Sequence, residues 1–148
     1  APRAERAGAT NIQTILLNPA QELDAFADFT GQADAVLIDA PCSGTGTWRR
    51  NPEARWRLDE KELARLTDIQ SYLLDLAVKL VKPGGRIVYV TCSLLDEEGA
   101  GQFDAFLGRH SELRPKELTL PLGRPRGKGI RLSPFHDGTD GFFIACAE

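Results

Sequence analysis

The sequence is short of several features that would define its class. It has no methionine and only three cysteines among 148 residues. An odd number of cysteines without metal-type spacing argues against a disulfide framework and indicates a reducing compartment, so we expect a cytoplasmic protein. No apolar run is long enough to cross a bilayer and no signal-peptide pattern is present, so no membrane partner is expected. Neither histidine has companions at ligand spacing, so no metal site is predicted.

Excess charge is also lacking. A net charge of −3 argues against a generally basic surface, so any contact with nucleic acid must be local. The length fits one domain with its own core. The chain opens on Ala1, and residues 1–9 are small, charged and poor in large apolar side chains. We expect a flexible segment over 1–9, a domain over 10–148, and a chain that is part of a longer protein.

Two cysteine motifs each follow a short apolar run. Residues 35–38 (AVLI) lead into 39–46 (DAPCSGTG), and residues 87–90 (IVYV) lead into 91–93 (TCS). Both runs are typical of buried strands, and apolar spacing predicts a helix between them from Asp59 to about Val81. Strand–helix–strand units are normally parallel, so both motifs reach the same sheet edge. We therefore expect the Cys42 and Cys92 side chains within roughly 10 Å of each other.

Other patterns complete an α/β prediction. Strands are expected at 10–17, within 113–122 and at 141–147, and helices at 20–29 and from Asp96 onward. Residues 82–85 (KPGG) end the long helix before the second strand, and 123–129 read as a loop. The pattern leaves the direction of the last strand open. Cys146, inside the last apolar strand, is expected in the core.

The two cysteine motifs in this order resemble the RsmB/NOP2/Sun family. Glu97-Glu98 after TCS, the KPGG turn and residues 140–145 (DGFFIA) extend the resemblance. It implies a Rossmann-like S-adenosylmethionine-dependent methyltransferase fold with a mostly parallel sheet, of which 10–148 would be the C-terminal part of the catalytic domain. The N-terminal strands and the glycine-rich cofactor loop are missing from these residues. The implied activity is methylation of cytosine C5 in RNA, and residues 45–58 (TGTWRRNPEARWRL) look like the bacterial ribosomal RNA members.

The resemblance implies a role for each residue of the site. Cys92 would be the nucleophile that adds to cytosine C6, and Cys42 would help to release the methylated product. Asp39 would lie between cofactor and target base, and Pro41 would shape the floor beneath the base. Asn18 stands where many members carry an aspartate near the cofactor adenine.

Aromatic and basic residues alternate just after the first cysteine motif. Arginine on phosphate and tryptophan on a base would suit RNA. An equally weighted interpretation is a surface loop whose tryptophans pack on the core. The candidate RNA-binding residues are Trp48, Arg49, Arg50, Arg55 and Arg57.

Two other functions stay open at this point. The chain could be a non-catalytic RNA-binding module on a methyltransferase scaffold, or a DNA cytosine methyltransferase in which Cys42 is the nucleophile. Because most of the cofactor half of the site is missing, we expect weak S-adenosylmethionine binding and no methyl transfer by this chain alone. We also expect the 10–17 strand to pair in a rearranged sheet or in a homodimer, or else an open sheet edge.

Overall fold

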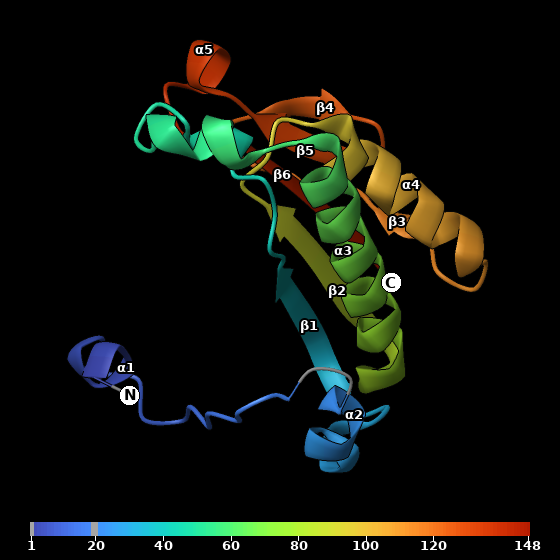
Figure 1. Ribbon diagram of the computed structural model, residues 1–148. Helices are drawn as coiled ribbons and strands as arrows, with labels where there is room; N and C mark the ends of the chain where they lie inside the picture. The colour runs from blue at the N-terminus through green and yellow to red at the C-terminus, as the bar shows by residue number, and fades with distance from the viewer. Residues whose placement is uncertain (1, 19–20) are drawn as a thin grey trace.

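The computed structural model describes residues 2–18 and 21–148 and shows one mixed sheet with two long helices on one face (Figure 1). The order in the sheet is β1-β2-β6-β5-β4, and β3 pairs with β6 off this path. The strands are β1 (Ala33–Asp39), β2 (Val81–Thr91), β3 (Pro115–Lys116), β4 (Arg124–Arg126), β5 (Gly129–Leu132) and β6 (Phe142–Ala147). The helices are α1 (Pro2–Arg6), α2 (Glu22–Ala25), α3 (Glu60–Leu80), α4 (Ala100–Arg109) and α5 (Pro134–Asp137), with 3₁₀ turns η1 (Ala27–Phe29), η2 (Thr45–Thr47), η3 (Pro52–Arg57) and η4 (Asp96–Glu98).

The β1–α3–β2 unit forms as the apolar pattern predicts. β1 and β2 are parallel, with Asp39 opposite Val90. Asp59 caps α3 by accepting the Glu62 N–H at 2.7 Å, which satisfies one of the unpaired donors at the helix start. The parallel pairing brings the ends of β1 and β2, and hence both cysteine motifs, to one edge of the sheet.

The remaining strands run differently from the expected pattern. The α/β class is confirmed, but among the described strands only β1 and β2 are parallel, and the other four pairings are antiparallel. The mostly parallel sheet is therefore a wrong expectation for this part of the chain. β6 runs antiparallel to β2, β3 and β5, and residues 123–129, expected as a loop, contain β4, which turns back on β5 through Gly127 at a φ of +55°.

Two further elements depart from the predictions. The described residues contain no strand at 10–17, which is extended and largely exposed and is not hydrogen-bonded to the free edge of β1. The region 113–122 contains only the two-residue β3. The helix expected over 20–29 is split into α2 and η1, and Ala20 lies outside the described residues.

The core lies between the sheet and the helices α3 and α4. Ile87, Tyr89, Phe103, Phe106 and Phe143 are each 0 % exposed, and burying a side chain of this kind contributes about 1.5–3 kcal/mol. The Cys146 side chain is buried as expected. Figure 1 shows α1 and the segment after it standing away from this body. None of the described helices is long and apolar enough to cross a membrane.

Candidate active site

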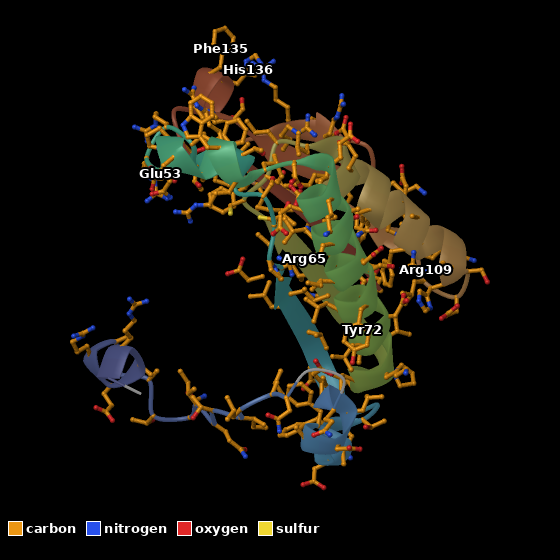
Figure 2. All side chains as sticks on the ribbon, in the orientation of Figure 1. Glu53, Arg65, Tyr72, Arg109, Phe135 and His136 are labelled. Carbon is orange, nitrogen blue, oxygen red and sulfur yellow. The ribbon has the colours of Figure 1, made fainter. Side chains whose placement is uncertain are left out.

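Two thiols meet where β1 and β2 end. Cys42 follows β1, Cys92 follows β2, and their Sγ atoms lie 3.4 Å apart. This confirms the prediction of about 10 Å or less. Figure 2 shows the segment that carries Glu53 (η3) beyond the carboxyl ends of both strands, and Ala54 and Arg57 of η3 line a cavity together with Cys42. A pair of thiols at this edge is positioned to act together on one bound group.

The two thiols differ in acidity. With Cys42 as the S–H donor, its hydrogen bond lowers the pKa of Cys92 from 9.0 to about 7, against the opposing effect of burial. The same bond, together with burial, raises the pKa of Cys42. Since the thiolate is the reactive form, Cys92 is the thiol prepared for nucleophilic attack near neutral pH.

A fully buried carboxylate lies behind the thiols. Glu98 accepts hydrogen bonds from the Ser43 N–H at 2.8 Å, from the Ser43 hydroxyl and from Gln70 Nε2 at 3.1 Å. Gln70 Nε2 also donates to the Pro41 C=O at 2.9 Å. The peptide groups on both sides of Cys42 are thus hydrogen-bonded to buried side chains.

Neither Glu98 nor Gln70 was predicted as part of the site. The acidic run that contains Glu98 was expected only to open a helix, yet α4 begins at Ala100 and Glu98 is 0 % exposed. A signal existed for Gln70, because it lies on the apolar stripe of α3 one turn from Leu66 and Leu74, which are both buried. A polar residue inside such a stripe indicates a buried hydrogen-bond partner.

Hydroxyl groups and two glycines connect the motifs to each other. Thr45 Oγ1 and Ser93 Oγ lie 3.0 Å apart, and the Gly46 N–H donates to the Cys92 C=O at 3.0 Å. The Gly141 N–H donates to the Gly46 C=O at 2.8 Å. A Cβ on Gly46 would lie 2.2 Å from the Gly141 oxygen, so the backbones are in direct contact. The DGFFIA segment therefore packs on the loop that carries Cys42.

Of the three residues assigned to the cofactor, Asp39 lines a groove between β1 and α3, and Asn18 and Pro41 are not among the described residues that line it. This groove of about 240 Å³ is lined by Leu17, Phe26, Leu37 and Asp39, among others, and Asp39 is exposed at its end. Asn18 follows Leu17, is exposed, and accepts the Gln21 N–H through its backbone at 3.0 Å. Pro41 precedes Cys42, with its C=O turned to Gln70. The groove is thus mostly apolar, and Asp39 is its charged lining residue.

The five candidate RNA-binding residues have different surroundings. Arg49 and Arg50 both form ion pairs with Asp140, at 3.5 and 2.5 Å. Trp48 is half-buried, and its enclosed Nε1 has no hydrogen-bond partner among the described residues. Trp48 therefore packs inward, as the alternative interpretation expected, while the arginines stay largely exposed.

Arg55 and Arg57 lie further along the same segment. The Arg55 guanidinium lies 4.4 Å from the ring centroid of Trp56, which is 78 % exposed. Arg57 lines a cavity of about 130 Å³ together with Cys42. Of the candidate arginines, Arg57 is the one that shares a cavity with a thiol.

Comparison with known proteins places this site in a family. The family model of 16S rRNA methyltransferase RsmB/F matches residues 3–147. The chain belongs to this family. It is 44 % identical over 77 % of its length to the ribosomal RNA small subunit methyltransferase B of Thermus thermophilus, and 38 % identical over 90 % to that of Xanthomonas campestris. These matches span 29 % and 31 % of the two relatives, so the chain corresponds to about a third of their length.

Solved structures of the family share the fold. NSun6 from Pyrococcus horikoshii, solved with SFG, an S-adenosylmethionine analogue, has a TM-score of 0.82 at 27 % identity. That match covers 99 % of this chain and 37 % of the other. The crystal structure of PH0851 gives a TM-score of 0.86 at 36 % identity and covers 98 % of this chain and 32 % of the other. The Rossmann-like methyltransferase fold is therefore confirmed for the described part of the chain.

Proposed function

We propose that this chain is the catalytic part of an S-adenosylmethionine-dependent RNA cytosine-C5 methyltransferase that acts on ribosomal RNA, with Cys92 as nucleophile. The observation that carries the proposal is the thiol pair, whose Sγ atoms lie 3.4 Å apart and in which Cys42, as the S–H donor, would lower the pKa of Cys92. Family membership supports the reaction class. A ribosomal RNA substrate would place the protein in the cytoplasm.

The chemistry follows from the acidity of Cys92. Its thiolate forms a bond to C6 of the target cytosine, which makes C5 an enamine-like nucleophile. The cofactor, when bound, supplies a methyl group on a sulfonium. Once C5 has taken this methyl group and a neutral thioether has been left behind, water accepts the C5 proton and the Cys92–C6 bond breaks, which restores the ring and the free thiolate. Cys42 is within reach of Cys92 Sγ throughout and is the group assigned to this release.

The surroundings of the thiols give the other residues their proposed roles. Asp39 would hydrogen-bond the exocyclic amine or N3 of the base, Pro41 would contact the base from below, and Asn18 would lie near the adenine. The target base must leave its stack to reach the thiols, which favours single-stranded RNA loops. The exposed arginines after Cys42 would contact the phosphates of such a loop.

The free edge of the sheet at β1 is a candidate contact surface for a second copy of the chain. β1 lies at one end of the sheet, and its Leu37 is 69 % exposed. In the isolated chain we propose that a second copy covers this side, because an unpaired edge with apolar side chains favours association.

The covalent adduct tests the enzymatic proposal. In a protein of the length of the relatives, Cys92→Ala abolishes both methyl transfer and the adduct, since no thiolate remains to attack C6. Cys42→Ala lets the adduct accumulate, because addition survives while release fails. Denaturing gels with labelled RNA report the adduct as a shifted band. Cys146→Ala, in the buried strand β6, is the matched control and keeps normal turnover.

The opposite outcome would exchange the roles. If Cys42→Ala lost the adduct while Cys92→Ala kept it, Cys42 would be the nucleophile, as in the DNA cytosine methyltransferase alternative. A comparison of RNA and DNA substrates then separates the two classes. If native protein bound RNA but formed no adduct and bound no cofactor, the non-catalytic module would be the better description.

A further inference from the structure

Cys42 lies between two peptide groups that buried side chains hold. On one side the Pro41 C=O accepts from Gln70 Nε2 at 2.9 Å, and on the other the Ser43 N–H donates to Glu98 Oε1 at 2.8 Å. Gln70 and Glu98 are also hydrogen-bonded to each other at 3.1 Å. Because both flanking peptide groups are hydrogen-bonded to buried side chains, the backbone at Cys42 is held in place. Gln70 and Glu98 therefore set the direction in which the Cα–Cβ bond of Cys42 points.

Glu98 is itself fixed to the strand that carries the other thiol. Its backbone C=O accepts from the Tyr89 hydroxyl at 2.8 Å and lies 3.5 Å from Thr91 Oγ1. Tyr89 and Thr91 belong to β2, and Cys92 follows directly. Glu98 thus ties the loop of Cys42 to the strand end of Cys92.

We propose that Glu98, acting with Gln70, is a positioning residue that holds Cys42 Sγ against Cys92 Sγ and so determines which of the two thiols reacts. It acts through Ser43 and Pro41. Its role rests on the proposed function only in taking Cys92 as the thiol that attacks RNA. Breaking these contacts would let Cys42 move away, and Cys92 would lose its hydrogen-bond donor.

Charge and position act on Cys92 in opposite directions, which makes the proposal testable. The negative charge of Glu98 raises the pKa of both thiols, and Asp39 acts on Cys92 in the same sense. Arg50 faces Cys92 with the opposite charge. Removing the charge of Glu98 alone would therefore lower the pKa of Cys92. Removing the hydrogen bond from Cys42 would raise it toward the value of a free thiol, about 8.5.

The experiment measures the pH dependence of alkylation. The full-length protein reacts with iodoacetamide from about pH 5.5 to 9.5, and peptide mass spectrometry reports Cys92 separately from Cys42. We expect Glu98→Ala to raise the midpoint for Cys92 by about one unit or more. Glu98→Gln keeps an acceptor oxygen for the Ser43 N–H, so its midpoint stays at or below the native one. Glu97→Ala, an exposed acid one position away, is the control and leaves it unchanged.

The Cys42→Ala background separates positioning from any direct effect. If Glu98 acts through Cys42, Glu98→Ala causes no further rise there. Should Glu98→Ala fail to fold, as judged by circular dichroism, Gln70→Leu removes the contact to Pro41 and is expected to raise the midpoint by the same mechanism. The proposal is overturned if folded Glu98→Ala or Gln70→Leu leaves the midpoint unchanged or lower. It is also overturned if Glu98→Gln raises it as Ala does, or if the rise persists without Cys42.

The same measurements keep this proposal apart from the proposed function. Alkylation needs neither RNA nor cofactor. A native protein with a low Cys92 midpoint that never forms an RNA adduct would refute the methyltransferase mechanism and leave the role of Glu98 intact. An active enzyme whose Cys92 alkylation midpoint does not change in the Glu98 and Gln70 variants would support the methyltransferase mechanism and refute the role of Glu98.

Discussion

Among individual residues, Arg57 has a neighbourhood unlike that of the other basic residues near the thiols. Arg49 and Arg50 share one carboxylate, that of Asp140, whereas Arg57 lines the same small cavity as Cys42. A phosphate or base next to a cytosine bound at the thiols would lie closer to the Arg57 guanidinium than to those of Arg49 and Arg50. Arg57 differs from the other arginines in its proximity to Cys42 and not in its charge.

We therefore expect Arg57→Ala to weaken RNA binding by about 1 kcal/mol, about fivefold, and to reduce the salt dependence by about one phosphate contact. Fluorescence anisotropy with labelled ribosomal RNA fragments over a salt series measures both effects. Arg109→Ala is the control, because Arg109 at the end of α4 is paired with Asp75 and lies far from the segment that carries Glu53 (Figure 2). Equal losses in both variants would show that Arg57 acts only through general charge.

Among the elements, the turn η2 and the start of β6 meet through bare backbone. Gly46 and Gly141 exchange no side-chain contact because neither has a side chain, and the Gly141 N–H bonds to the Gly46 C=O. This backbone contact holds the loop that carries Cys42 against the start of β6. The two glycines of the motif have different structural reasons: Gly44 has a φ of +67°, and Gly46 provides the close approach to Gly141.

Replacing Gly46 by Ala is expected to destabilise the protein by about 2 kcal/mol, because the new methyl group overlaps the Gly141 backbone. Thermal unfolding should show a fall of about 5 °C for a chain of this size. Gly108→Ala is the matched control. Gly108 lies in α4 with nothing within 4 Å of an added Cβ, so this change should stabilise the helix by about 0.5–1 kcal/mol. Equal effects in the two variants would contradict the contact.

Strongly periodic elements were predictable from the sequence and context-dependent ones were not. The β1–α3–β2 unit and the meeting of Cys42 and Cys92 follow from apolar spacing and parallel pairing. The strand at 10–17 was wrong because a strand requires a neighbour, which its own residues do not reveal. β4 was read as a loop because Gly, Pro and Arg carry no apolar signal. The burial of Glu98 could not be predicted from the sequence, because its hydrogen-bond partners Ser43 and Gln70 are distant along the chain.

At the scale of the whole molecule, we propose that the described residues form only one wall of a cofactor site. The groove along β1 has apolar residues and Asp39 on one side. We expect the 148-residue chain to bind S-adenosylmethionine more weakly than micromolar and to transfer no methyl group. Isothermal titration calorimetry measures this, with the full-length relative from Thermus thermophilus as positive control. Micromolar or tighter binding by the 148-residue chain would show that its site is complete.

The open side of β1 predicts association of the isolated chain. Sedimentation velocity over a concentration series should show a monomer–dimer equilibrium, and Leu37→Lys should shift it toward monomer by placing a charge on the apolar side. Leu122→Lys, an exposed leucine in the turn before β4, should leave the equilibrium unchanged. A chain that stays monomeric at all concentrations would rule out the homodimer.

The N-terminal segment that stands away from the sheet has a consequence for protease digestion. Between Arg6 and Arg49 the sequence contains no lysine or arginine. Trypsin therefore has no cleavage site between Arg6 and Arg49 and leaves the exposed stretch attached to β1. Leu16, 88 % exposed, is open to a protease with apolar specificity such as chymotrypsin. Digestion with the two enzymes in parallel thus separates the sheet and its helices from the segment before them.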